Sequence, residues 1–127
     1  MDWCAAPGHW LGHEVLERYG CRMAEGLGLT ADQYTVCFQS RLQSRLRDPW
    51  LQPYTDDALK EMPPKGWKHI LAFSPAFVAD CLETTIEVGE EFKELFEEHG
   101  GVHWELVPSL NSEPVWVEAV AEMVRRS

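Results

Sequence analysis

Three short runs of strand-forming residues, separated by stretches with helical periodicity, constrain the fold of this chain more than any other feature. The runs are residues 34–40 (YTVCFQS), 67–74 (WKHILAFS) and 102–107 (VHWELV). The first two are mostly apolar, which is typical of strands covered on both faces. Alternating helices and strands favour a parallel sheet with right-handed crossovers. We therefore predict an α/β fold of three layers, α/β/α, around a parallel sheet.

Helices are predicted before, between and after these runs. The first spans residues 12–27, and the second starts at Thr55 and must end at the Pro63-Pro64 pair. The third spans residues 80–98 and ends at a glycine pair. Its expected apolar partners are Leu82, Ile86, Phe92, Leu95 and Phe96.

A last helix is predicted near the end of the sequence, with Asn111 or Ser112 as its N-cap. Its expected apolar face consists of Val117, Val120, Met123 and Val124. The 127 residues suit one domain, 1–127, in which we expect residues 1–11 to fray.

Composition restricts the partners of the chain. With 11 basic and 21 acidic residues, the net charge of −10 disfavours nucleic acid and anionic lipid. No apolar stretch reaches membrane-spanning length, and the first residues lack the pattern of a signal peptide. The four cysteines have neither C-x-x-C nor zinc-finger spacing. We expect a cytoplasmic protein with reduced thiols and without a membrane span.

The segment FVADCLETTIEVGEEF carries a row of acids, Glu83, Glu87 and Glu91, with Asp80 three residues before the first. Like charges four residues apart mildly destabilise a helix, so the row is either a solvated face or a site that handles cations. Asp80 and Glu83 follow a predicted strand, where α/β folds bind ligands. Partly apolar surroundings would raise their pKa values and suit a general base. Alternatively, Asp80 only caps the helix.

A loop with a tandem duplication, QSRL-QSRL at residues 39–46, follows the first predicted strand. Trp50 lies between two prolines in this loop and either stacks on a flat ligand or packs beneath the loop. Arg41 either binds an anionic group or is solvated. Cys81 is either a soft ligand or a small buried residue.

The motifs DPWLQPYTDDALKEM, KGWKHILAFSPAFVADCLETTIEVGEEFKELFEEHGG and VPSLNSEPVWVEAVA resemble the C-terminal lobe of bacterial ferrochelatases. That family inserts ferrous iron into a porphyrin in haem synthesis. The resemblance implies a chelatase-like, Rossmann-like lobe. It also implies a lyase whose substrates are ferrous iron and a porphyrin, and no tightly bound cofactor is expected. The scattered cysteines argue against an iron–sulfur cluster.

The resemblance assigns roles residue by residue. Glu83 and Asp80 match the catalytic carboxylates, and Glu83, Glu87 and Glu91 match an acidic metal path along a π-type helix turn. The residues implied in porphyrin binding are Trp50, Arg41 and Cys81. A first lobe with a further histidine has no counterpart here. The chain is therefore expected to need that lobe or a second copy of itself as a homodimer, or else to bind a tetrapyrrole without catalysis.

Overall fold

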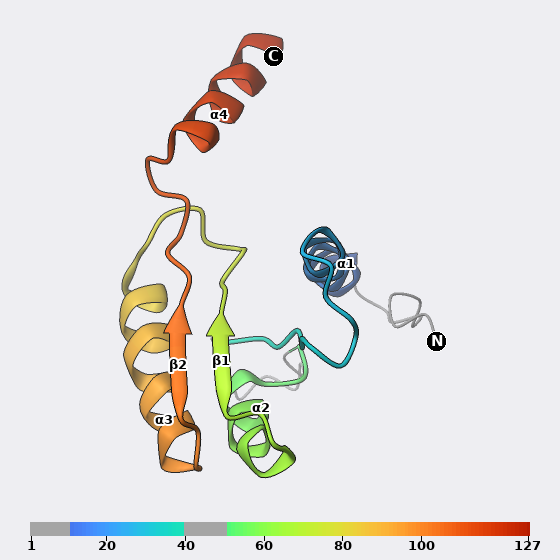
Figure 1. Ribbon diagram of the computed structural model, residues 1–127. Helices are drawn as coiled ribbons and strands as arrows, with labels where there is room; N and C mark the ends of the chain where they lie inside the picture. Colours follow the sequence, from blue (N-terminus) through green and yellow to red (C-terminus); the bar gives the residue numbers. More distant parts are fainter. Residues whose placement is uncertain (1–10, 40–50) are drawn as a thin grey trace, which may run out of the picture. The chain divides into compact units, whose positions relative to one another are not determined.

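The computed structural model describes residues 11–39 and 51–127, with side chains described from residue 18 onward in the first range. The chain forms two compact units, Met1–Ala58 and Leu59–Ser127. Within the described ranges, none of the helices combines the length and the apolar character needed to cross a bilayer. Figure 1 shows the elements along the chain.

The first unit contains helix α1, Leu11–Gly26, as predicted. Phe38 lies in an isolated parallel bridge with Tyr54, in which its amide donates to the Pro53 carbonyl at 2.9 Å. The prediction of a strand over residues 34–40 is therefore wrong for its described part, which holds a single bridge. The pairing stops because helix α2, Thr55–Glu61, begins directly after Tyr54.

The second unit contains a two-stranded parallel sheet, which confirms the predicted α/β class. Strand β1, His69–Ala72, pairs with strand β2, His103–Leu106, with His69 opposite His103. A short 3₁₀ helix η1, Pro63–Lys65, precedes β1. The prolines thus end α2 as predicted, because neither can continue its hydrogen bonds.

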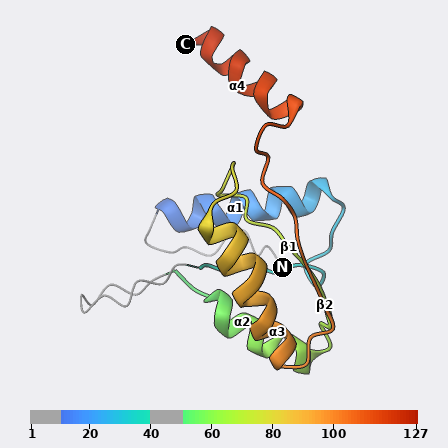
Figure 2. The same cartoon turned by 90° about the vertical axis from the view of Figure 1, so that its left-hand side faces the viewer.

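A long helix connects the two strands and covers one face of the sheet. It starts as a π-helix η2, Glu83–Glu91, and continues as α-helix α3, Phe92–Glu98. The amide of Phe92 donates to the carbonyl of Glu87, five residues earlier. In Figure 2 this helix, which lies to the left of the strands in Figure 1, faces the viewer.

The wide turns of η2 change which side chains are buried. Thr84 and Val88 are buried, whereas Leu82 is 74% exposed and Ile86 is 39% exposed. The prediction that Leu82 and Ile86 pack into the core is therefore wrong, because it assumed α-helical periodicity. Phe92 and Phe96 lie in the α-helical part and are buried as predicted.

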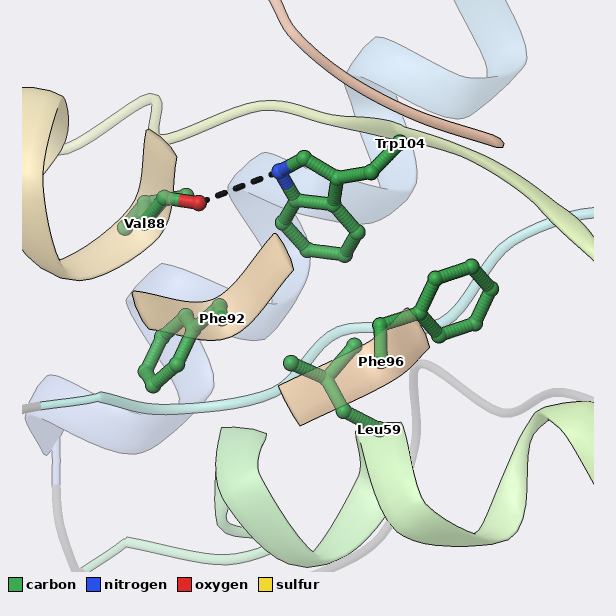
Figure 3. Close-up of a cluster of buried hydrophobic side chains, with 5 residues drawn as sticks. All are labelled: Leu59, Val88, Phe92, Phe96 and Trp104. Carbon is green, nitrogen blue, oxygen red and sulfur yellow. Dashed lines mark hydrogen bonds between the residues drawn. The ribbon is translucent and has the colours of Figure 1, made fainter. Parts of the chain in front are cut away.

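The core of the second unit lies between this helix, α2 and the sheet. It consists of Leu59, Val88, Phe92, Phe96 and Trp104 (Figure 3). The indole Nε1 of Trp104 donates to the Val88 carbonyl at 3.1 Å, and the ring lies 5.7 Å from that of Phe96.

The other face of the sheet carries exposed side chains, including Leu71 at 66% exposure and both paired histidines. The predicted second helical layer is not found among the residues of this unit. The residues that bury their side chains against the sheet all come from the side of α2, η2 and α3.

Helix α4, Pro114–Arg126, ends the described chain. Its N-cap is Glu113, which makes no side-chain capping bond, so the prediction of Asn111 or Ser112 as the cap is wrong. Asn111 instead adopts a left-handed conformation with φ 48° in the preceding loop. The apolar face predicted for this helix exists but is exposed, with Val117 at 52% and Val124 at 71%.

Candidate functional site

An open hollow on the side of η2 brings the acid row together. It is lined by Leu82, Glu83, Ile86, Glu87 and Glu91. The three glutamates therefore lie on one side of the helix, as their spacing predicted. Leu82 and Ile86, which are both exposed, line the same hollow, so carboxylates and hydrocarbon share one surface.

Glu83 begins the π-helix and is exposed. A hydrogen bond from the Cys81 side chain, and a second from the backbone of Glu83 itself, lower the pKa of its carboxyl group. The expectation of a raised pKa is therefore wrong, because the carboxyl group is in water rather than in apolar surroundings. Glu83 is ionised at neutral pH, which makes it a proton acceptor and an attractive group for a cation.

Cys81 lies beside Glu83 and is half-buried. Its amide donates to the Thr84 hydroxyl at 2.9 Å, and its carbonyl accepts from the Thr85 hydroxyl at 2.8 Å. These bonds fix the backbone at the first turn of η2. The Cys81 side chain is therefore held where it contacts the Glu83 carboxylate.

Asp80 precedes the helix, and its carboxylate accepts hydrogen bonds from other residues of the chain. Its Oδ2 accepts from Asn111 Nδ2 at 2.8 Å, and its Oδ1 accepts from the Ser109 amide at 3.1 Å. These bonds, with that of Asn111 the largest cause, lower the pKa of the carboxyl group. The expectation of a raised pKa is thus wrong for Asp80 as well, since hydrogen bonds stabilise its charged form.

The hydrogen bonds of Asp80 do not support the alternative in which this residue only caps the helix. Its carboxylate receives donors from the loop after β2, and only the Thr84 hydroxyl, at 3.4 Å, comes from η2. These contacts join the segment that follows β1 to the segment that follows β2. Ser109, Asn111 and Thr84 were not singled out from the sequence as site residues.

Two sequence-predicted site residues, Trp50 and Arg41, lie outside the described residues, as does most of the QSRL duplication. Within the described ranges, no three His, Cys, Asp or Glu side chains are grouped so that they could hold one metal ion. Glu83, Glu87 and Glu91 share the hollow but are spread along it.

Comparison with known proteins identifies relatives of this chain. The family model described as Ferrochelatase matches residues 13–127. A ferrochelatase of Marinobacter nauticus is 49% identical over 102 residues, which cover 80% of this chain and 27% of that protein. A ferrochelatase of Idiomarina loihiensis is 44% identical over 105 residues, or 83% of this chain and 28% of that protein.

A ferrochelatase of Pseudomonas fluorescens is 44% identical over 110 residues, which cover 87% of this chain and 31% of that protein. Across these three comparisons, the chain matches 27% to 31% of the relative's length.

Proposed function

Because the chain belongs to the ferrochelatase family, we propose that it forms the second lobe of an enzyme that inserts ferrous iron into a porphyrin in haem biosynthesis. The observation that carries this proposal is the hollow on η2, which three glutamates line together with two exposed apolar side chains. A flat, apolar macrocycle that receives an ion at its centre needs apolar surface for the ring and carboxylates for the ion.

In the proposed reaction, two pyrrole N–H protons leave the porphyrin and one ferrous ion takes their place. Glu83 is the proposed base, since its carboxyl group is ionised and exposed; it accepts the two protons one after the other and passes each to water. Glu87 and Glu91 lead the ion along the hollow toward Glu83, and each exchanges part of the ion's hydration shell for carboxylate oxygens. Ferrous iron and the porphyrin are both substrates.

Three more residues are proposed to bind the porphyrin. Trp50 stacks on the macrocycle, Arg41 binds an anionic substituent, and Cys81 lies at the edge of the hollow beside Glu83. The proposal includes no tightly bound cofactor and no iron–sulfur cluster. It places the protein in the cytoplasm, in line with its composition.

The other wall of the porphyrin cleft must come from elsewhere, because the chain spans about a third or less of its relatives. We propose that a separate first lobe supplies it. A second copy of this chain is the alternative. Light scattering at micromolar concentration separates the two, since a strict monomer excludes the homodimer.

The test compares Glu83→Gln with Glu90→Gln, a neutralised acid on the same π-helix that does not line the hollow. Each chain is mixed with the part of the Marinobacter nauticus relative that it does not match. Porphyrin metallation is followed with ferrous iron and with zinc, which has no redox chemistry. We expect metallation by the unchanged chain, a loss of about 10²- to 10⁴-fold in Glu83→Gln, and little change in Glu90→Gln.

If neither this mixture nor the chain alone metallates a porphyrin, the proposed enzyme is wrong. A shift of the porphyrin Soret band without metallation then favours a lobe that only binds tetrapyrroles. The observation that keeps this second function open is that the chain matches only 27% of the length of the Marinobacter nauticus relative.

A further inference from the structure

A group of hydrogen bonds joins the loop before η2 to the loop after β2. Asn111 accepts from the Asp80 amide at its Oδ1 (2.9 Å) and donates from its Nδ2 to Asp80 Oδ2 (2.8 Å). The Asn111 amide donates to the Val78 carbonyl at 2.9 Å, and the Ser109 amide donates to Asp80 Oδ1 at 3.1 Å. We call Asp80, Ser109 and Asn111 the clasp.

Asparagine satisfies two requirements at position 111. Its backbone has φ 48°, in the left-handed region that asparagine tolerates better than most residues. Its side chain must accept a hydrogen bond from the Asp80 amide and donate one to the Asp80 carboxylate. A carboxamide does both in one orientation only, with its oxygen toward the amide and its nitrogen toward the carboxylate. The second Nδ2 hydrogen donates to the Ser109 carbonyl at 3.0 Å. Both ends of the amide are therefore used.

The clasp reaches the first turn of η2 through Thr84, which is 1% exposed. The Thr84 hydroxyl accepts from the Cys81 amide at 2.9 Å, and its own hydrogen has two possible acceptors, the Cys81 carbonyl at 3.0 Å and Asp80 Oδ1 at 3.4 Å. Glu83 lies between Cys81 and Thr84 in the sequence. Its backbone is thus held on both sides by groups that the clasp locates.

We propose that Asn111 is a positioning residue for Glu83, acting through Asp80, and that Asp80 holds the start of the π-helix rather than reacting with substrate. The catalytic part of this inference rests on the proposed function. The Asp80 carboxylate already accepts from two donors of the loop after β2, whereas Glu83 lines the hollow. The two acids therefore have different roles although they are three residues apart.

Two substitutions at position 111 separate the side chain from the backbone. Asn111→Gly keeps the left-handed conformation and removes the amide. Asn111→Asp keeps the size but sets a carboxylate against that of Asp80, so it is expected to be worse. In the mixture described above, we expect kcat to fall about 10- to 100-fold in Asn111→Gly, with KM for the porphyrin changed less than about twofold. Ser112→Ala, an exposed neighbour, serves as the matched control and should leave both constants unchanged.

The reciprocal exchange is the decisive variant. Asp80→Asn alone sets two carboxamides against each other. Asp80→Asn combined with Asn111→Asp restores a donor facing a carboxylate and an acceptor facing the residue-80 amide. It replaces the donor to the Ser109 carbonyl by a carboxylate oxygen, so full recovery is not expected. We expect the double variant to recover at least about tenfold in kcat over Asn111→Asp. If it remains as inactive as the worse single variant, the Asp80 carboxylate itself is required and the inference is overturned.

Backbone hydrogen exchange in this chain alone distinguishes this inference from the proposed function. In Asn111→Gly, the Asp80 and Ser109 amides should exchange at least about tenfold faster, while those of β1 and β2 are unchanged. Unchanged exchange at both amides would overturn the clasp, whatever the enzyme does. If the amides exchange faster but kcat is unchanged in a mixture that metallates the porphyrin, only the positioning role of Asn111 is overturned. If the unchanged chain does not metallate a porphyrin in the mixture, the proposed function is overturned, and the exchange result still supports the clasp.

Discussion

At the scale of single residues, Trp104 joins strand β2 to the π-helix that carries the acids. Its side chain is buried, and its indole donates to the carbonyl of Val88 in the middle of η2. A π-helix is a rare conformation, and it persists where tertiary contacts favour it over the α-helix. Trp104 supplies such a contact on the buried side of the segment whose other side forms the hollow.

Trp104→Phe should therefore destabilise the second unit. The variant keeps an aromatic ring against Phe96 but removes the donor to the Val88 carbonyl, and we expect a loss of about 1–2 kcal/mol in the free energy of unfolding. Trp116→Phe, on helix α4, is the control with the same chemical change and should cost less than about 0.5 kcal/mol. Urea unfolding followed by circular dichroism measures both, and equal losses would contradict the anchoring role of Trp104.

The sequence allowed Asp80 and Glu83 to be chosen as site residues but not to be told apart. Both follow strand β1 and both are acidic, so periodicity and position treat them alike. Their difference depends on Ser109 and Asn111, which lie about thirty residues away in the sequence. Asn111 itself was interpreted as a helix cap, because an asparagine shortly before a helix is the usual signal for one. The contact of Asn111 with Asp80, in a loop distant in the sequence, leaves no local sequence pattern.

At the scale of elements, glycine and proline signals predicted boundaries well, and apolar periodicity predicted faces less well. The two strands, α1, α2 and the end of α3 were confirmed, because each depends on local chemistry. The prediction of which face of η2 is buried was wrong. Hydrogen bonds between residues five apart give a π-helix a different periodicity from the α-helical one that the prediction assumed. The strand expected over residues 34–40 required a neighbouring strand of similar length to pair with, and the sequence of these residues does not specify one.

The turn between α3 and β2 shows how closely an element boundary is specified. Gly100 has φ 95°, its amide donates to the Glu97 carbonyl, and the Gly101 amide donates to the Phe96 carbonyl. This is a Schellman motif. A Cβ at Gly101 would overlap the ring of Phe96, which is fully buried.

Gly101→Ala should therefore be among the more damaging small substitutions in the chain. The added methyl group must displace Phe96 from the core, and we expect a loss of about 1–3 kcal/mol or more in the free energy of unfolding. Gly66→Ala is the comparison, because position 66 has open space but a φ of 99°, so it should cost about 1–2 kcal/mol from the backbone alone. A Gly101→Ala variant as stable as the unchanged chain in urea would refute the packing argument.

At the scale of the whole molecule, the core of the second unit and the hollow on η2 use different side chains, apart from their common helix. The core residues are contributed by α2, η2, α3 and β2, and all lie between residues 59 and 104. The hollow, in contrast, is open, and the matched region makes up only 27% to 31% of the relatives' length. Stability and function are therefore separable, since the unit can fold on contacts that the proposed cleft does not use.

Helix α4 provides the test of that separation. Its residues are all described and none is buried, and five of its apolar side chains are exposed: Val115, Val117, Val120, Met123 and Val124. Deleting residues 114–127 should change the free energy of unfolding of the second unit by less than about 1 kcal/mol, because little apolar area becomes newly exposed. Leu59→Ala, which truncates a core side chain that is 2% exposed, should cost about 2–5 kcal/mol and shows that the assay detects a loss.

The same deletion should lower the binding of a dye that fluoresces on exposed apolar surface, because it removes five exposed apolar side chains at once. Both measurements use the unchanged chain as reference. A deletion that destabilises the unit as much as Leu59→Ala would mean that α4 packs onto the core in solution. In that case the exposed valines would be part of the fold, and the argument that the second unit is complete without α4 would be wrong.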